Sequence, residues 1–280
     1  MIHSCAYTKP TNLEDAVSAL HEENARVLAG GTDLLVDMRG GIKKTDLVVD
    51  IKGIENLNVL SVDSDRGASI GAAVTLNALI ESKKLKERYP VLPDAAFTIA
   101  TYQLRNRATM VGNICNASPA ADMAPPLYIL GAKVLIAGRN GERSVPIDTF
   151  ITGVKETILD KGEIVTRVEI PPLSKNSKMV FLKKQRIKGH DLATINIAGL
   201  ADRGSQQLKI CIGACAETPL LLEKTDELYR EEKDVEKLAE RIFELALQSI
   251  SPIDDVRSSA EYRRNMVRIY VNRVLQEICL

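Results

Sequence analysis

Two stretches of the chain combine glycine with hydroxyl, amide and carboxylate side chains, a combination that suits a phosphate-bearing cofactor. In the first, residues 26–35 (RVLAGGTDLL), an apolar run predicts a short buried strand, Gly30 and Gly31 form a turn, and Thr32 is expected to cap a helix. Glycine lets the backbone approach a ligand, and free N–H groups at a helix start favour phosphate. The residues alone fit an ordinary strand-to-helix turn equally well, and they match neither G-x-G-x-x-G nor the Walker pattern.

The second stretch covers residues 103–122 (QLRNRATMVGNICNASPAAD). Thr109, Gly112 and Asn113 supply a hydroxyl, a glycine and an amide, which suit further phosphate or ribityl contacts. Ser118 is expected to cap a helix over 119–130 that has proline at its first position. Asp122 then lies one turn into this helix, where a carboxylate is also explained simply by the helix dipole.

The chain shows no acid–base or nucleophilic machinery, so we predict no catalytic side chain and no metal site. Its three histidines lack a matching serine or cysteine constellation. Its five cysteines are an odd number without the spacing of a zinc or iron–sulfur site, and we interpret them as reduced, mostly buried thiols. A bound cofactor is therefore expected to carry the chemistry.

Composition predicts a cytoplasmic protein that binds neither nucleic acid nor membrane. The formal net charge is zero, and 45% of the residues are hydrophobic. No apolar run approaches the roughly 20 residues of a spanning helix, and the N-terminus lacks the features of a signal peptide.

The elements that must position these stretches predict an α+β fold. A helix from residue 11, the strand at 27–29 and a strand at 46–51 form a small parallel β-α-β sheet within residues 1–56. From 57 to 172 the pattern changes to hairpins and predicts a larger mixed or antiparallel sheet. The remaining predicted strands of this part are 58–62, 68–74, 133–137, 142–147 and 162–171, with a buried helical segment at 95–100.

The proline-rich segment 171–177 is the best internal boundary. It divides the chain into residues 1–172 and a C-terminal α+β domain, residues 178–280. This second domain has three predicted antiparallel strands, at 180–187, 193–201 and 208–214, followed by a helical bundle. We interpret the apolar stripes of its last two helices as core.

Together the two stretches resemble the FAD-binding subunit, or domain, of the molybdenum-containing hydroxylases, which include xanthine dehydrogenase, carbon monoxide dehydrogenase, nicotinate dehydrogenase and 4-hydroxybenzoyl-CoA reductase. The resemblance runs from Tyr7-x-x-Pro10 to the Tyr262-Arg263 pair of the last helix. It implies that residues 1–172 form a two-part FAD-binding domain. The positions that fall on flavin contacts of the family are Arg26, Val27, Leu28, Ala29, Gly30, Gly31, Thr32, Asp33, Leu34, Ile99, Thr109, Gly112, Asn113, Asp122, Val165 and Lys183.

The resemblance also implies a division of labour among subunits. A large partner would hold molybdopterin and a small partner iron–sulfur clusters, while FAD on this chain would collect the electrons and reduce an acceptor such as NAD(P). One departure is Val111, where the family usually has glycine. Because valine disfavours positive φ, Val111 is expected to be extended, or the flavin to sit slightly differently. From spacing alone, Lys183 is equally a solvated strand lysine.

Two other functions fit a flavin fold of this kind. One is a self-contained flavin oxidase or reductase related in shape to vanillyl-alcohol oxidase. The other is a non-enzymatic module that has lost its flavin, which the intact Gly30-Gly31-Thr32 turn and Asp122 argue against. The FAD interpretation requires the two glycine-bearing bends to meet in space.

Overall fold

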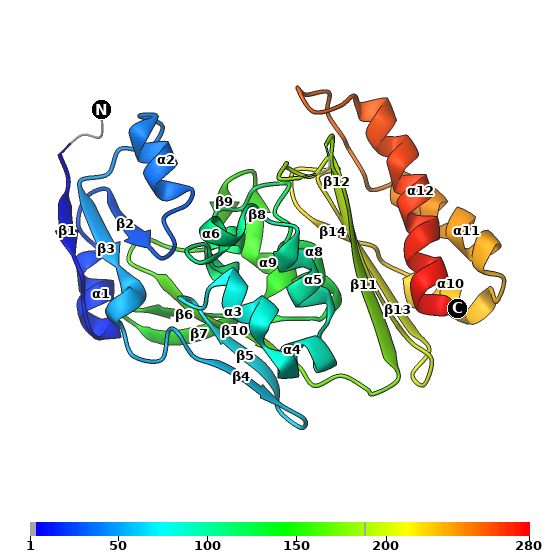
Figure 1. Cartoon of the computed structure of the whole chain (residues 1–280), viewed down its shortest axis with the longest axis horizontal. Helices are drawn as coiled ribbons and strands as arrows, with labels where there is room; N and C mark the ends of the chain where they lie inside the picture. Colours follow the sequence, from blue (N-terminus) through cyan, green and yellow to red (C-terminus); the bar gives the residue numbers. More distant parts are fainter. Residues whose placement is uncertain (1–3, 188) are drawn as a thin grey trace.

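The computed structural model describes residues 4–187 and 189–280. It contains a three-stranded sheet of order β1-β3-β2, a five-stranded sheet of order β4-β5-β10-β6-β7, and a four-stranded sheet of order β11-β12-β13-β14. Figure 1 shows these sheets following one another along the long axis of the molecule, with the chain's middle helices between the second and third. The predicted α+β class is confirmed.

The N-terminal sheet is parallel, as predicted, because a helix separates each strand from the next. Asn12 caps the first helix by accepting a hydrogen bond from the Asp15 N–H. The edge strand β1 was not predicted. The elements are β1 (Ala6–Thr8), α1 (Leu13–Ala19), β2 (Ala25–Leu28), α2 (Leu34–Arg39), β3 (Leu47–Asp50) and the short 3₁₀ helix η1 (Ile51–Gly53).

The five-stranded sheet is antiparallel throughout, and its predicted hairpins β4–β5 and β6–β7 are present. Its strands are β4 (Leu60–Asp63), β5 (Gly67–Gly71), β6 (Lys133–Gly138), β7 (Gly141–Pro146) and β10 (Ile164–Ile170). The helices inserted between them are α3 (Leu76–Glu81), α4 (Lys83–Arg88), α5 (Val91–Phe97), α6 (Tyr102–Arg105), α7 (Met110–Cys115), α8 (Ala124–Ile129) and α9 (Ile147–Phe150). A small unpredicted hairpin, β8 (Ile151–Gly153) with β9 (Glu156–Thr157), follows α9.

The C-terminal part holds the three predicted antiparallel strands and a short fourth one. These are β11 (Ser177–Lys184), β12 (Ile195–Asp202), β13 (Gln207–Gly213) and β14 (Leu220–Leu221). The helices α10 (Thr225–Glu231), α11 (Val235–Leu247) and α12 (Ala260–Cys279) complete it. None of the helices within residues 4–187 and 189–280 has the length and apolar character needed to cross a membrane.

Strand β12 lies between two hydrophobic cores, and every one of its residues is buried. Ala198 and Leu200 face the core shared with the first 172 residues, whereas Ile195, Ile197 and Ala201 face the core formed with α11 and α12. This alternation follows from the two-residue period of a strand. In Figure 1 the sheet is seen nearly edge-on, with α8 on one side and α12 on the other.

The predicted helix over 119–130 is wrong at its start, since α8 begins only at Ala124. Pro125 and Pro126 explain this shift: they lack N–H donors, so they fit the first turn of a helix but would break its interior. Ser118 therefore does not cap a helix. Its hydroxyl accepts from the Ala120 N–H at 3.3 Å within a turn.

Two further local predictions need correction. Thr32 does not cap α2, because the N-cap position is Asp33 and the Leu35 N–H donates to the Gly31 carbonyl. Val111 is neither extended nor in need of a positive φ, because it lies in the first turn of α7 with its side chain in the core. The glycine that this turn requires is Gly112, where a Cβ would lie 2.9 Å from the Thr109 hydroxyl.

Candidate functional site

The two glycine-bearing bends meet in the fold. A Cβ built on Gly30 would lie 2.2 Å from the Arg107 carbonyl oxygen and 2.9 Å from the Ala108 Cα, so only glycine allows this backbone contact. Gly31 has φ +77°, and a Cβ there would lie 2.8 Å from a methyl carbon of Leu28. The first glycine thus permits contact with the second bend, and the second glycine turns the chain into α2.

The first bend presents a row of free donors. Among the described residues, the backbone N–H groups of Gly30, Gly31, Thr32, Asp33 and Leu34 donate no hydrogen bond. Buried or half-buried N–H groups are nearly always paired, so a run of unpaired ones needs an acceptor from outside the chain. Consecutive N–H groups of a turn that enters a helix form the usual recognition site for a diphosphate.

Asn116 ties the bends together through side chains. Its amide nitrogen donates to the Asp33 carboxylate at 2.8 Å, and its amide oxygen accepts from the Lys155 ammonium at 2.8 Å. Lys155 lies in the β8–β9 turn, and its own N–H donates to the Ala117 carbonyl. Three separate segments therefore converge beside the first bend. Asn116 was not predicted, although it lies inside the 103–122 stretch.

The second bend is held in shape by Thr109, which is buried. The Thr109 hydroxyl accepts from the Gly112 N–H at 2.9 Å and so caps α7. One turn later, the Asn113 side-chain oxygen accepts from the Met123 N–H at 3.2 Å. This contact places the second bend directly beside Asp122.

Asp122 is the centre of a buried polar cluster rather than a helix-start charge. Its carboxylate accepts from the Lys183 ammonium at 2.7 Å and from the Asn196 amide at 2.8 Å. The Lys183 side chain is only 3% exposed, so the alternative of a solvated strand lysine is wrong. Burial raises the pKa of Asp122, because removal from water penalises its carboxylate, while Lys183 and Asn196 act in the opposite direction.

Lys183 also reaches the segment that carries Ile99. Its ammonium donates to the Thr98 carbonyl at 3.3 Å. The predicted helical segment 95–100 ends at Phe97, and Ala100 adopts φ +46°. Ile99 is therefore in a bend after α5, half-buried against the core.

The Arg105 side chain holds the bend after α5 in place. The guanidinium donates to the carbonyls of Phe97, Ile99 and Ala100 at 3.2, 2.9 and 2.7 Å. It also donates to Asn77 at 3.2 Å. A buried arginine that satisfies three carbonyls fixes the backbone on which Ile99 stands. Sequence reasoning missed Arg105, although it also lies inside the 103–122 stretch.

A second unpredicted network supports the first bend. The Lys52 ammonium donates to the Ala29 carbonyl at 3.0 Å and lies 2.7 Å from the Asp50 carboxylate. The Tyr7 hydroxyl donates to the same carboxylate at 2.7 Å. Adjacent parallel strands bring these side chains together, so only the strand register could have revealed the network.

Two of the predicted site residues stand apart from these contacts. The Arg26 side chain is exposed, and in the described part of the chain its guanidinium makes no hydrogen bond or ion pair. Val165 lies in β10 within the core, near a bulge between Val165 and Arg167. The remaining positions form one continuous path, from Gly30 through Thr109, Asn113, Asp122 and Lys183 to the bend at Ile99.

Comparisons with known families cover nearly the whole chain. Residues 3–173 match the family model described as the FAD binding domain in molybdopterin dehydrogenase. Residues 181–278 match the model of the CO dehydrogenase flavoprotein C-terminal domain.

Individual relatives match over their full length. The chain is 31% identical over 282 residues to a putative xanthine dehydrogenase FAD-binding subunit of Escherichia coli, covering 99% of this chain and 97% of the relative. It is 30% identical to the glyceraldehyde dehydrogenase medium chain of Sulfolobus acidocaldarius, covering 98% of each. Among solved structures, a chain of carbon monoxide dehydrogenase from Hydrogenophaga pseudoflava is similar with a TM-score of 0.94, 27% identity, and coverage of 99% and 98%.

Proposed function

This chain belongs to the family of FAD-binding medium subunits of molybdenum hydroxylases, and we propose from this premise that it transfers electrons within a multi-subunit oxidoreductase. Its FAD-binding domain would hold FAD, and bound FAD accepts and donates electrons. The observation that carries the proposal is the contact between the two bends. The first bend contains the N–H groups of Gly30 to Leu34, which have no partner in the described residues, and the second bend contains Thr109 and Asn113. The chain itself binds, orients and shields the cofactor.

The residues fit FAD. In our proposal the diphosphate accepts hydrogen bonds from the N–H groups of residues 30–34, and Thr109, Gly112 and Asn113 line the adjoining part of the site. Asp122 and Lys183 supply charge next to the cofactor, and Ile99 and Val165 supply apolar contact. Arg26, Val27 and Leu28 belong to β2, and Ala29 follows it and leads into the first bend. The support is that five consecutive N–H groups have no partner within the described residues, and a diphosphate offers several oxygens that can accept from them.

Partners complete the reaction. We propose that a large subunit holds molybdopterin and oxidises the organic substrate, and that a small subunit with iron–sulfur clusters passes electrons to the FAD here. The FAD would then reduce an acceptor such as NAD(P). The support is that relatives of similar length are subunits or medium chains of dehydrogenases, and that the matching family model is the FAD binding domain in molybdopterin dehydrogenase.

The proposal includes the domain division and location. Residues 1–172 would bind FAD, with subdomains at about 1–56 and 57–172, and residues 178–280 would form the C-terminal domain. The location would be the cytoplasm, which agrees with five cysteines that are all free in the structure.

The test begins with the purified chain. We expect a yellow protein with a flavin absorbance spectrum and one FAD per chain after reconstitution. Co-purification from the native source should yield two further chains together with molybdenum, iron and sulfide. A chain that takes up no flavin under any refolding condition would contradict the cofactor assignment, and turnover of a small organic substrate by the isolated chain would contradict the subunit assignment.

A further inference from the structure

A cavity of about 190 Å³ lies at the junction of the two halves of the chain, apart from the flavin site. It is lined by the β4–β5 turn, the end of α4 and the linker that leads into β11. The Tyr89 hydroxyl closes one wall by donating to the Pro171 carbonyl at 2.9 Å. Both halves of the molecule therefore contribute to one small polar space.

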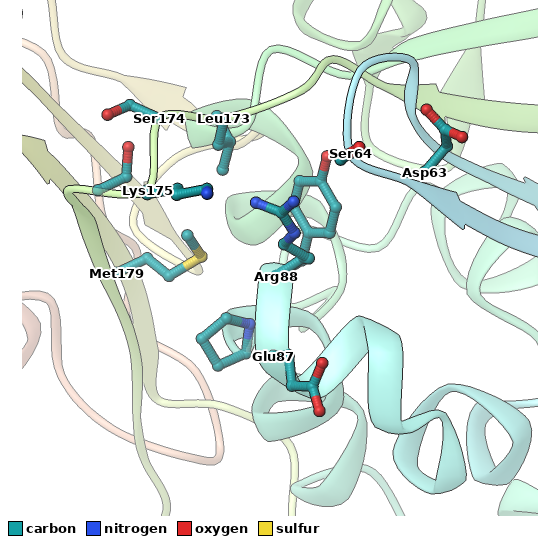
Figure 2. A pocket seen from close by; sticks show the side chains of 11 residues that line it. Asp63, Ser64, Glu87, Arg88, Leu173, Ser174, Lys175 and Met179 are labelled. Atoms are coloured by element: carbon teal, nitrogen blue, oxygen red, sulfur yellow. The ribbon is translucent and has the colours of Figure 1, made fainter.

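Two cations face each other across this cavity. Figure 2 shows the Lys175 side chain extending towards Arg88, whose guanidinium points back towards Lys175. In the described residues neither group makes a hydrogen bond or an ion pair; Arg88 is half-buried and Lys175 is exposed. Like charges that face each other without an anion repel, and the low dielectric of a protein surface strengthens this repulsion.

Asp63 and Glu87 also belong to the lining, but in the described residues neither carboxylate forms an ion pair with Arg88 or Lys175, and Asp63 lies 3.9 Å from the Arg66 guanidinium instead. The Asp63 carboxylate already accepts from the N–H groups of Asp65 and Arg66, each at 2.9 Å. In Figure 2 the Glu87 carboxylate points away from the Arg88 guanidinium. The hydroxyl of Ser64 adds a neutral hydrogen-bond donor to the lining.

We propose that this cavity binds a small phosphate-type dianion between Arg88 and Lys175. The volume equals about six times the share of one water molecule in the liquid, which holds a tetrahedral oxyanion and a few waters. It lies below the roughly 300 Å³ at which pockets for drug-sized ligands begin, which favours a small ion over a nucleotide. Arginine and lysine are the side chains that most often recognise such oxyanions.

Binding there would clamp the linker onto the first half of the chain. Arg88 ends α4, whereas Lys175 lies in the segment between β10 and β11. An anion held by both side chains joins these elements through two charge-assisted contacts. We therefore expect the protein to melt at a higher temperature with the anion bound, because a ligand that binds only the folded state stabilises that state.

The experiment is a calorimetric titration of inorganic phosphate into the FAD-saturated chain, at constant ionic strength against sodium chloride. Saturation with FAD keeps phosphate out of the diphosphate site, and flavin absorbance reports that occupancy separately. We expect saturable binding of one phosphate per chain. Affinity should fall about tenfold in Arg88→Gln and in Lys175→Gln, because each loses a charged partner.

Matched controls separate this site from general charge. Lys178 is exposed and lies near Lys175, but it does not line the cavity, so Lys178→Gln should bind phosphate like the wild type. The charge-preserving Arg88→Lys and Lys175→Arg variants should retain most of the affinity. An absence of saturable binding to the FAD-saturated wild type, or an equal loss in Lys178→Gln, would overturn the proposal.

Discussion

Lys183 and Asn196 are directly opposite each other on β11 and β12, and both side chains contact the Asp122 carboxylate from the same face of the sheet. Asp122 belongs to the first half of the chain and its two partners to the second. One buried ion pair and one amide therefore join the two halves, in addition to the apolar core that they share. It lies beside the proposed flavin site.

Removing Lys183 should be costly because it leaves Asp122 buried without its cation. We expect Lys183→Met to lower the free energy of unfolding by about 3–5 kcal/mol, and Asp122→Asn by a similar amount. The double variant should lose clearly less than the sum, since neither charge is then left alone. Urea unfolding at neutral pH measures this cycle. Lys184→Met, at the next position of β11, provides the control, and strictly additive losses would contradict the coupling.

Substitution of Gly30 tests the meeting of the two bends. In Gly30→Ala the new methyl group must displace the Arg107 carbonyl, so we expect at least a tenfold loss of FAD affinity. Gly40→Ala is the control, because Gly40 (φ −76°), like Gly30, has no positive φ, and its Cβ would approach no atom closer than 3.4 Å. Fluorescence titration with FAD gives both affinities. Equal losses in the two variants would mean that the close contact has no bearing on the cofactor.

Arg105 should act on the flavin through the bend it anchors. Arg105→Met leaves the carbonyls of Phe97, Ile99 and Ala100 without their donor, and we expect a loss of about 2–4 kcal/mol in stability. If the bend touches the flavin, the absorbance maximum and reduction potential should also shift. Arg107→Met, two residues away and exposed, is the control for charge. An unchanged flavin spectrum in a folded Arg105→Met variant would contradict a contact between this bend and the cofactor.

Asp255 should make the C-terminal domain sensitive to acid. Burial alone would raise the pKa of Asp255, but the guanidiniums of Arg257 and Arg263 hold it well below its usual range. The stabilisation is thus present above the unfolded-state pKa, about 3.9, and is lost as pH falls through the lower folded-state pKa. At neutral pH we expect Asp255→Asn to cost roughly 1–3 kcal/mol.

Chemical unfolding from pH 7 to pH 2 measures this effect. The difference in stability between wild type and Asp255→Asn should begin to shrink below about pH 4, because the unfolded-state carboxyl group then binds a proton that the folded state does not. Asp148→Asn is the control, because Asp148 is exposed and makes no side-chain hydrogen bond in the described residues. A difference that stays constant with pH would contradict the electrostatic account.

The sequence predicted the class of fold and most of its strands, since apolar alternation and turn residues mark them locally. It also predicted the meeting of the two bends, through the resemblance rather than through periodicity. Helix starts were less predictable: the Pro125–Pro126 pair, not Ser118, sets the start of α8. Val111 was misjudged because a glycine of the family was equated with a positive φ.

The polar partners of the site were beyond local reasoning. The sequence of its strand does not tell whether the Lys183 side chain is exposed or buried. Asn196 lies beside it only because β11 pairs with β12. Likewise, Lys52 reaches the Ala29 carbonyl because their strands are neighbours in the parallel sheet. Such contacts depend on strand register and domain packing, which a sequence pattern specifies only indirectly.

Strand β12 has a practical consequence for work with fragments. Because it closes two cores at once, cutting the chain at the linker would uncover the side of α8 that packs on β12 and β13, together with the matching face of the sheet. Each fragment would expose a continuous hydrophobic surface, and proteins with such surfaces tend to aggregate. Fragments made for crystallisation or spectroscopy should therefore be co-expressed, so that the two fragments associate before either one precipitates.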